Sequence, residues 1–226
     1  STGHPTPDNL QPWIRSIQRL SQQVASEYPQ LQQCWIGLRL GATLAVQAAD
    51  GHTVDSMVLI EPVIKGRQYA REIEALSAMS TTASDQQVGL IEGAGFPLCQ
   101  SMLEDIRRID LASVLTGGNY PNIFYMHDPD RTPATAWLDA LANTDKTLAI
   151  SPFDGYQEML AEPHFTAVPW RSFSLVKEWL ADRSQPAGLP HFSAISDQVS
   201  VRITVDDNDI EEQLLTVPGP SSIFAI

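Results

Sequence analysis

Two glycines, Gly37 and Gly41, stand between a short apolar run and a stretch of small residues. The apolar run Cys34-Trp35-Ile36 has the composition of a buried strand, and residues 42–49 have that of a helix. A chain that passes from strand to helix within five residues turns so sharply that side chains two positions from the middle would collide with the sheet. The sequence therefore predicts a tight strand-to-helix turn with Arg39 at its tip.

Apolar strands and amphipathic helices alternate beyond this turn. Further strands are expected at 56–60, 122–126 and 146–150. Helices are expected at 65–79, 98–109, 134–143 and 172–180, and before the turn from an N-cap at Asp8 to Pro29. Residues 80–95 read as a loop or cap, and Phe173, Val176, Trp179 and Leu180 as the buried stripe of the last helix. This alternation predicts an α/β fold, a mostly parallel sheet with helices on both faces.

The chain changes character after Asp182. Residues 183–198 contain Ser-Gln-Pro-Ala-Gly-Leu-Pro, which is typical of a linker, and 199–205 alternate with the period of a strand. Residues 214–217 and 223–226 are expected to accompany that strand. The predicted organisation is a core at 1–182, a linker at 183–198 and a β-rich tail at 199–226.

The composition excludes several classes of partner. The formal net charge of −13, from 27 acidic against 14 basic residues, would repel a nucleic-acid backbone. No apolar run is long enough to span a bilayer, and the first residues lack the features of a secretory signal. Only two cysteines are present, which favours a reducing cytoplasm. Because neither metal-ligand spacing nor a dinucleotide fingerprint occurs, no metal and no cofactor are expected.

Arg39 determines what the predicted turn can do. A guanidinium stays protonated in proteins, so it cannot serve as an acyl-accepting nucleophile. A fixed cation beside the amides of a helix N-terminus instead attracts a carboxylate or phosphate. We therefore expect Arg39, Leu40 and Glu61 to bind substrate. The alternative is an internal ion pair between Arg39 and Glu61, which follows the neighbouring strand; the two interpretations are compatible.

The stretch from Trp35 to Ala45 resembles the nucleophile elbow of the α/β-hydrolase superfamily, in particular of hydrolase-like proteins associated with exosortase A systems. The resemblance implies the same arginine in place of the nucleophilic serine. Three further stretches agree in order and spacing: Glu61 to Tyr69, His127 to Arg131, and Gly155 to Met159 through Pro163-His164 to Val168-Pro169. Together they span about residues 1–180.

The fold that this resemblance implies assigns roles to three further residues. Asp128 and Asp130 follow a strand where the catalytic acid stands, and His164 lies in the late loop that delivers the histidine. The alternative for the aspartates is local hydrogen bonding in a loop, and for His164 a bond to the backbone. We expect action on a small acyl, ester or thioester compound, with Arg39 binding an anionic group and His164 as general base. The competing hypothesis is a catalytically inactive binding or assembly module.

The resemblance also implies strands ahead of residue 8 that the sequence lacks. Because the tail resembles the N-terminal hairpin of such a domain, we expect a fragment, a circular permutation or part of a tandem protein. An uncovered sheet edge would favour aggregation, so a homo-oligomer, a partner chain or the tail itself is expected to cover it.

Overall fold

The computed structural model describes residues 8–80, 90–93, 96–114, 119–161 and 164–184, and four strands at 200–205, 208–213, 215–217 and 223–225. The chain divides into two units, Ser1–Pro186 and Ala187–Ile226. Each unit is described by itself.

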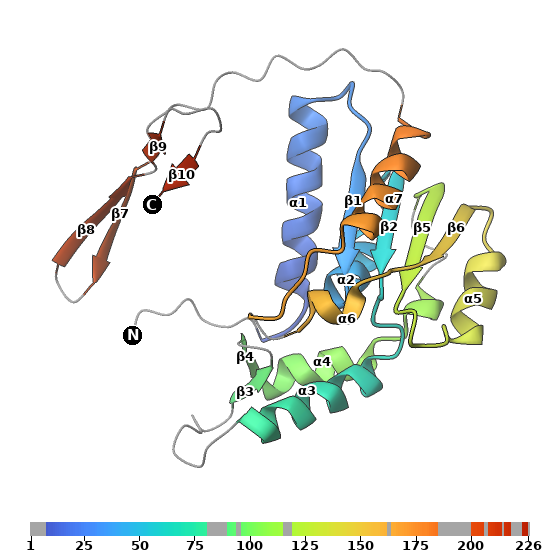
Figure 1. The fold of residues 1–226 in the computed structure, drawn as a ribbon, viewed down its shortest axis with the longest axis horizontal. Helices are drawn as coiled ribbons and strands as arrows, with labels where there is room; N and C mark the ends of the chain where they lie inside the picture. The colour runs from blue at the N-terminus through green and yellow to red at the C-terminus, as the bar shows by residue number, and fades with distance from the viewer. Residues whose placement is uncertain are drawn as a thin grey trace. The chain divides into compact units, whose positions relative to one another are not determined.

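A four-stranded parallel sheet organises the first unit (Figure 1). Its strands are β1 (Cys34–Leu38), β2 (Ser56–Ile60), β5 (Asn122–His127) and β6 (Thr147–Pro152), in the order β1-β2-β5-β6. Cys34 aligns with Ser56, and Ser56 with Asn122, so the carboxyl ends of these three strands lie level. The parallel sheet expected from the sequence is confirmed.

Helices cover both faces of the sheet, and the four apolar residues of β2 after Ser56 pack against both layers. Met57 and Leu59 pack with α2 (Leu40–Ala48) and α5 (Thr135–Ala142), through residues that include Val46 and Trp137. Val58 and Ile60 point to the opposite face, where α6 (Tyr156–Met159) and α7 (Trp170–Ala181) contribute Tyr156, Val176 and Trp179. All five β2 residues are buried, as alternation between two covered faces requires.

The connection between β2 and β5 forms a separate layer across the carboxyl end of the sheet (Figure 1). It consists of α3 (Gly66–Ser80), the antiparallel strands β3 (Leu90–Gly93) and β4 (Phe96–Cys99), α4 (Gln100–Arg108) and the short 3-10 helix η1 (Leu111–Ser113). Ala70 and Ile73 of α3 pack against Met102 and Leu103 of α4. The α1 helix (Gln11–Glu27) joins the same cluster through Ile14 and lies against α2.

The second unit consists of two antiparallel pairs. β7 (Ser200–Val205) pairs with β8 (Asn208–Gln213), and β9 (Leu215–Val217) pairs with β10 (Ile223–Ala225). This agrees with the β-rich tail expected from the period-two alternation.

Three local expectations were wrong. Asp8 does not cap α1: the helix begins after Leu10, whose amide donates to Asp105 of α4 instead. Residues 90–93 form a strand rather than a loop because they pair with β4. Phe173 is exposed although it packs on Phe153, since α7 turns mainly Val176 and Trp179 toward the sheet. None of the described helices is both long and apolar enough to cross a membrane.

Candidate functional site

The turn between β1 and α2 has the strained backbone that its sequence predicts. Arg39 is the single residue between strand and helix, with φ 52° and ψ −124°. A non-glycine residue with positive φ in a sparsely populated region costs about 1–3 kcal/mol. The surrounding hydrogen bonds hold it there: the Arg39 amide donates to the Ile60 carbonyl at 2.9 Å, and its carbonyl accepts from the Ala42 amide at 3.1 Å.

The two flanking glycines are not equivalent. A Cβ atom on Gly37 would overlap the backbone of Ala42, so this position requires glycine. A Cβ on Gly41 would meet nothing within 4 Å. The expectation that both positions exclude a side chain is therefore wrong for Gly41, because this exposed second residue of α2 points away from the sheet.

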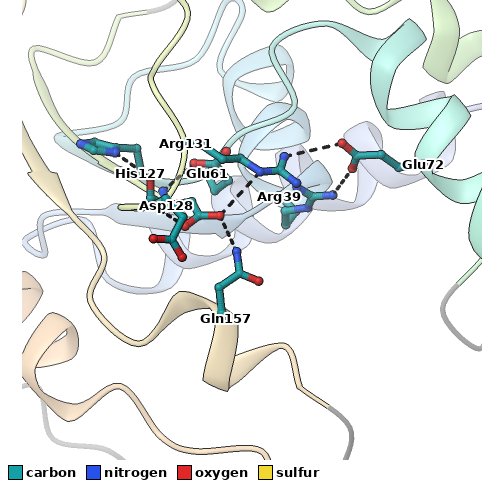
Figure 2. Close-up of polar contacts among 8 residues, drawn as sticks. Arg39, Glu61, Glu72, His127, Asp128, Arg131 and Gln157 are labelled. Carbon is teal, nitrogen blue, oxygen red and sulfur yellow. Dashed lines mark hydrogen bonds and ion pairs between the residues drawn. The ribbon is translucent and has the colours of Figure 1, made fainter.

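The Arg39 side chain forms an internal ion pair, but its partner is Glu72 of α3 rather than Glu61 (Figure 2). Arg39 Nη2 donates to Glu72 Oε2 at 2.6 Å, and the guanidinium lies 5.0 Å from the centroid of the Tyr69 ring. Glu61 is occupied elsewhere, because its Oε2 accepts from the Asp128 amide at 2.8 Å. Glu61 also has a positive φ, 41°, which makes the end of β2 a second strained position in the site.

Partial burial leaves the charge of Arg39 intact. Burial by itself lowers the pKa of Arg39, but the hydrogen bond with Glu72 and the nearby charges outweigh it, so the pKa lies above its ordinary value. The side chains of Arg39 and Glu72 are 24% and 30% exposed, so both remain in contact with solvent. The guanidinium is therefore a permanent, accessible cation at the tip of the turn.

Asp128, directly after β5, is a completely buried carboxylate. Its Oδ2 accepts from Gln157 Nε2 at 2.6 Å and lies 3.6 Å from Nε of Arg131, while its Oδ1 accepts from the Asp130 amide at 3.0 Å. Asp130 itself is exposed and closes a local turn through that amide. For both aspartates the structure thus contains the local hydrogen bonding that was the alternative to a catalytic acid.

The segment after β6 contacts the site through α6 rather than through His164: Tyr156 approaches Arg39, and Gln157 donates to Asp128. His164 is an exposed turn residue and is not among the residues that line the cavity described below. Tyr156 is buried, and its hydroxyl lies close to the Arg39 guanidinium without completing a hydrogen bond to any described residue. Burial raises the pKa of Tyr156 to about 12, so the hydroxyl stays protonated. Sequence reasoning missed Tyr156, although Gly155-Tyr156 stands just beyond a strand end, where such sheets place functional residues.

A cavity of about 150 Å³ opens at the carboxyl ends of β2 and β5. Arg39, Glu61 and Glu72 contribute to its lining, as do Lys65, Tyr69, Tyr125, His127, Arg131 and the segment 132–134. His127, the last residue of β5, is the histidine of this lining, and sequence reasoning assigned it no role. In Figure 2 it lies at one end of the polar cluster and Glu72 at the other, with Arg39 next to Glu72. Within the described residues, no three His, Cys, Asp or Glu side chains gather as metal ligands would.

The sequence matches no protein-family model and no curated protein, whereas the fold matches solved structures. The esterase Est1E from Butyrivibrio proteoclasticus superposes with a TM-score of 0.53 at 14% identity, over 77% of this chain and 71% of Est1E. The esterase domain of a Rhodothermus marinus protein gives a TM-score of 0.48 at 16% identity, over 76% of this chain and 69% of that one. The α/β hydrolase GrgF from a Penicillium species gives 0.45 at 12% identity, over 74% and 70%.

The sheet, the strained turn and the Est1E superposition together define the fold class. The chain has the α/β-hydrolase fold, with Arg39 at the tip of its strand-to-helix elbow.

Proposed function

We propose that this protein hydrolyses a small acyl, ester or thioester compound that carries an anionic group, without forming an acyl-enzyme. The observation that carries the proposal is one cavity lined by both a permanent cation, Arg39, and a histidine, His127. Its volume of about 150 Å³ is below the roughly 300–1,000 Å³ typical of drug-sized ligands, which favours a small compound. Arg39 and the adjacent Leu40, the first residue of α2, bind the anionic group, and Glu61 lies between the two ends of the site.

We assign the general base to His127, because His164 does not line the cavity. His127 Nδ1 lies 3.0 Å from the Asp128 carbonyl oxygen, which accepts hydrogen bonds but cannot donate them. Nδ1 therefore carries the proton, and Nε2 has the free lone pair of a base. Nε2 takes a proton from water, the hydroxide adds to the acyl carbon, and the tetrahedral intermediate expels an alkoxide or thiolate, which takes the proton from the imidazolium and leaves as the alcohol or thiol.

The second candidate is a binding or assembly module that retains the fold without the chemistry. The residues that line the cavity in the described part of the chain include neither Ser nor Cys, and Arg39 is already paired with Glu72. These observations agree with a site that only binds.

A panel of acyl esters and thioesters, each with and without a free carboxylate, separates these candidates. We expect wild-type turnover, a fall in kcat of about 10²–10⁴ for His127→Ala, and no change for His164→Ala. Arg39→Ala should raise KM for the carboxylate-bearing esters alone. Absence of wild-type turnover on the whole panel would favour the module. A loss with His164→Ala but not with His127→Ala would restore His164 as the base.

A partner chain is a further part of the proposal. Among the described strands, β1 pairs on one side only, with β2, and the Ile36 side chain on β1 is exposed. A strand with one unpaired edge and exposed apolar side chains is a template for association. We propose that a second copy or another chain covers this edge. Solution mass at micromolar concentration tests for a second copy, and a monomer at all concentrations would contradict self-association.

A further inference from the structure

Two arginines converge on one carboxylate at the mouth of the cavity (Figure 2). Glu72 Oε2 accepts from Arg39 Nη2 at 2.6 Å, and Glu72 Oε1 lies 3.6 Å from Arg131 Nη1. The arginines come from different connections, Arg39 from the elbow and Arg131 from the loop after β5, whereas Glu72 comes from α3. The structure therefore contains an internal example of what this arginine pair binds: a single carboxylate, with one oxygen toward each guanidinium.

Glu72 can leave this position without burying its own charge. Its side chain is 30% exposed, so rotation toward solvent restores its hydration. Arg131 keeps its contact with the buried carboxylate of Asp128 at 3.6 Å, and it is 47% exposed. Arg39 keeps the Tyr69 ring but loses the one hydrogen bond that its guanidinium donates to a described carboxylate. The vacated position thus holds a cation with free N–H groups, facing the cavity.

We propose that Arg39 and Arg131 form a clamp for the carboxylate of the substrate, and that Glu72 occupies the clamp until the substrate displaces it. This deepens, and rests on, the proposed binding of an anionic group at Arg39. The exchange replaces one carboxylate by another, so the charge of the cluster is unchanged.

The placement of the clamp also limits the shape of the substrate. Figure 2 shows His127 at one end of the polar cluster and Glu72, which occupies the clamp, at the other, and His127 and both arginines line the same cavity. A compound that spans them has its carboxylate at one end and its scissile acyl group at the other. The half-ester or half-thioester of a short dicarboxylic acid has this arrangement.

Calorimetric titration with butyrate, and with butyramide as its uncharged counterpart, tests the clamp without requiring turnover. Because Glu72 competes for the clamp, Glu72→Gln should raise butyrate affinity about tenfold or more. Arg131→Gln in the Glu72→Gln background should abolish this gain. Butyramide binding should be the same in all variants. Glu74→Gln is the matched control: Glu74 is on α3 and pairs with Arg107 outside the clamp, so butyrate affinity should not change.

Unchanged butyrate affinity in Glu72→Gln would overturn the clamp, as would a gain that survives Arg131→Gln. If Glu72→Gln does not fold, Glu72→Asp replaces it, since the shorter side chain cannot reach both arginines and should show the same gain. Butyrate binding with these effects in a chain that turns over no ester would support the clamp and refute only the proposed hydrolysis. Turnover in a chain without these effects would overturn only the clamp.

Discussion

A Cβ atom on Gly37 would lie 2.5 Å from the amide nitrogen of Ala42, and closer still to its Cα. The elbow brings the end of β1 against the first turn of α2, and this contact fixes how closely the strand and the helix can approach. Gly37, two positions before Arg39, therefore sets where α2 packs.

Substitution at the two elbow glycines should have opposite effects. Gly37→Ala forces the backbone of α2 to move and should lower the free energy of unfolding by about 1–3 kcal/mol. Gly41→Ala, which meets nothing within 4 Å, should leave stability unchanged or raise it by up to about 1 kcal/mol through better helix propensity. Urea denaturation of the two variants measures the difference. Equal losses would mean that residues 37–41 do not form the turn described.

The close approach of α3 to α4 should be equally sensitive. A Cβ on Gly66 would overlap the carbonyl oxygen of Ile106, so Gly66→Ala must separate the two helices. We expect a larger loss of thermal stability than for Gly51→Ala, where the space is open and only the φ of +70° costs about 1–2 kcal/mol. Melting temperatures of both variants test this. A milder effect at Gly66 would contradict the packing of the two helices.

Loss of the buried Asp128 side chain should destabilise the fold more than loss of the exposed Asp130 side chain. Asp128→Ala leaves Gln157 and the Asp130 amide without their acceptor and should cost about 1–3 kcal/mol. The matched variant Asp130→Ala removes an exposed side chain and should stay within about 0.5 kcal/mol of wild type. Chemical denaturation distinguishes them. Comparable effects would show that the Asp128 carboxylate does not organise this loop.

Cys34 should give the fold an alkaline limit. Burial, and secondarily Asp55, raises the pKa of its thiol from 9.0 to about 11. Because the folded pKa exceeds the unfolded one, this stabilisation is complete below pH 9 and is lost as the pH rises toward 11. Cys34→Ser should flatten the decline in stability between pH 9 and 11.

At pH 8, alkylation of native Cys34 by iodoacetamide should be about a hundredfold slower than in urea, following the thiolate fraction. Equal rates would contradict the burial.

Most of the first unit follows from patterns within single segments. The apolar run of β2 and the glycine-flanked turn at Arg39 each depend on neighbours a few residues away, so periodicity and turn chemistry locate them. The parallel order then follows from the alternation of strands and helices. The antiparallel pair β3–β4 was missed because its pairing depends on residues whose composition is that of a loop.

The partners within the site depend on distant segments, which sequence patterns do not report. Glu72 reaches Arg39 only because the α3–α4 layer crosses the carboxyl end of the sheet, and nothing in residues 65–79 distinguishes it from Glu74. His127 and His164 both follow expected strands. Only His127 lines the cavity. The chain after β6 contributes Tyr156 and Gln157 to the polar cluster before it reaches His164.

Tyr156 belongs to two parts of the protein at once. Its ring is packed edge-on to Phe153 in the cluster that contains Val176 and Trp179, while its hydroxyl lies close to the Arg39 guanidinium. An aromatic ring is rigid, so a shift of α7 at one end moves the hydroxyl at the other. Tyr156 thereby links the packing of α7 on the sheet to the surroundings of Arg39. Substitutions in α7 will alter the position of the Tyr156 hydroxyl relative to that guanidinium.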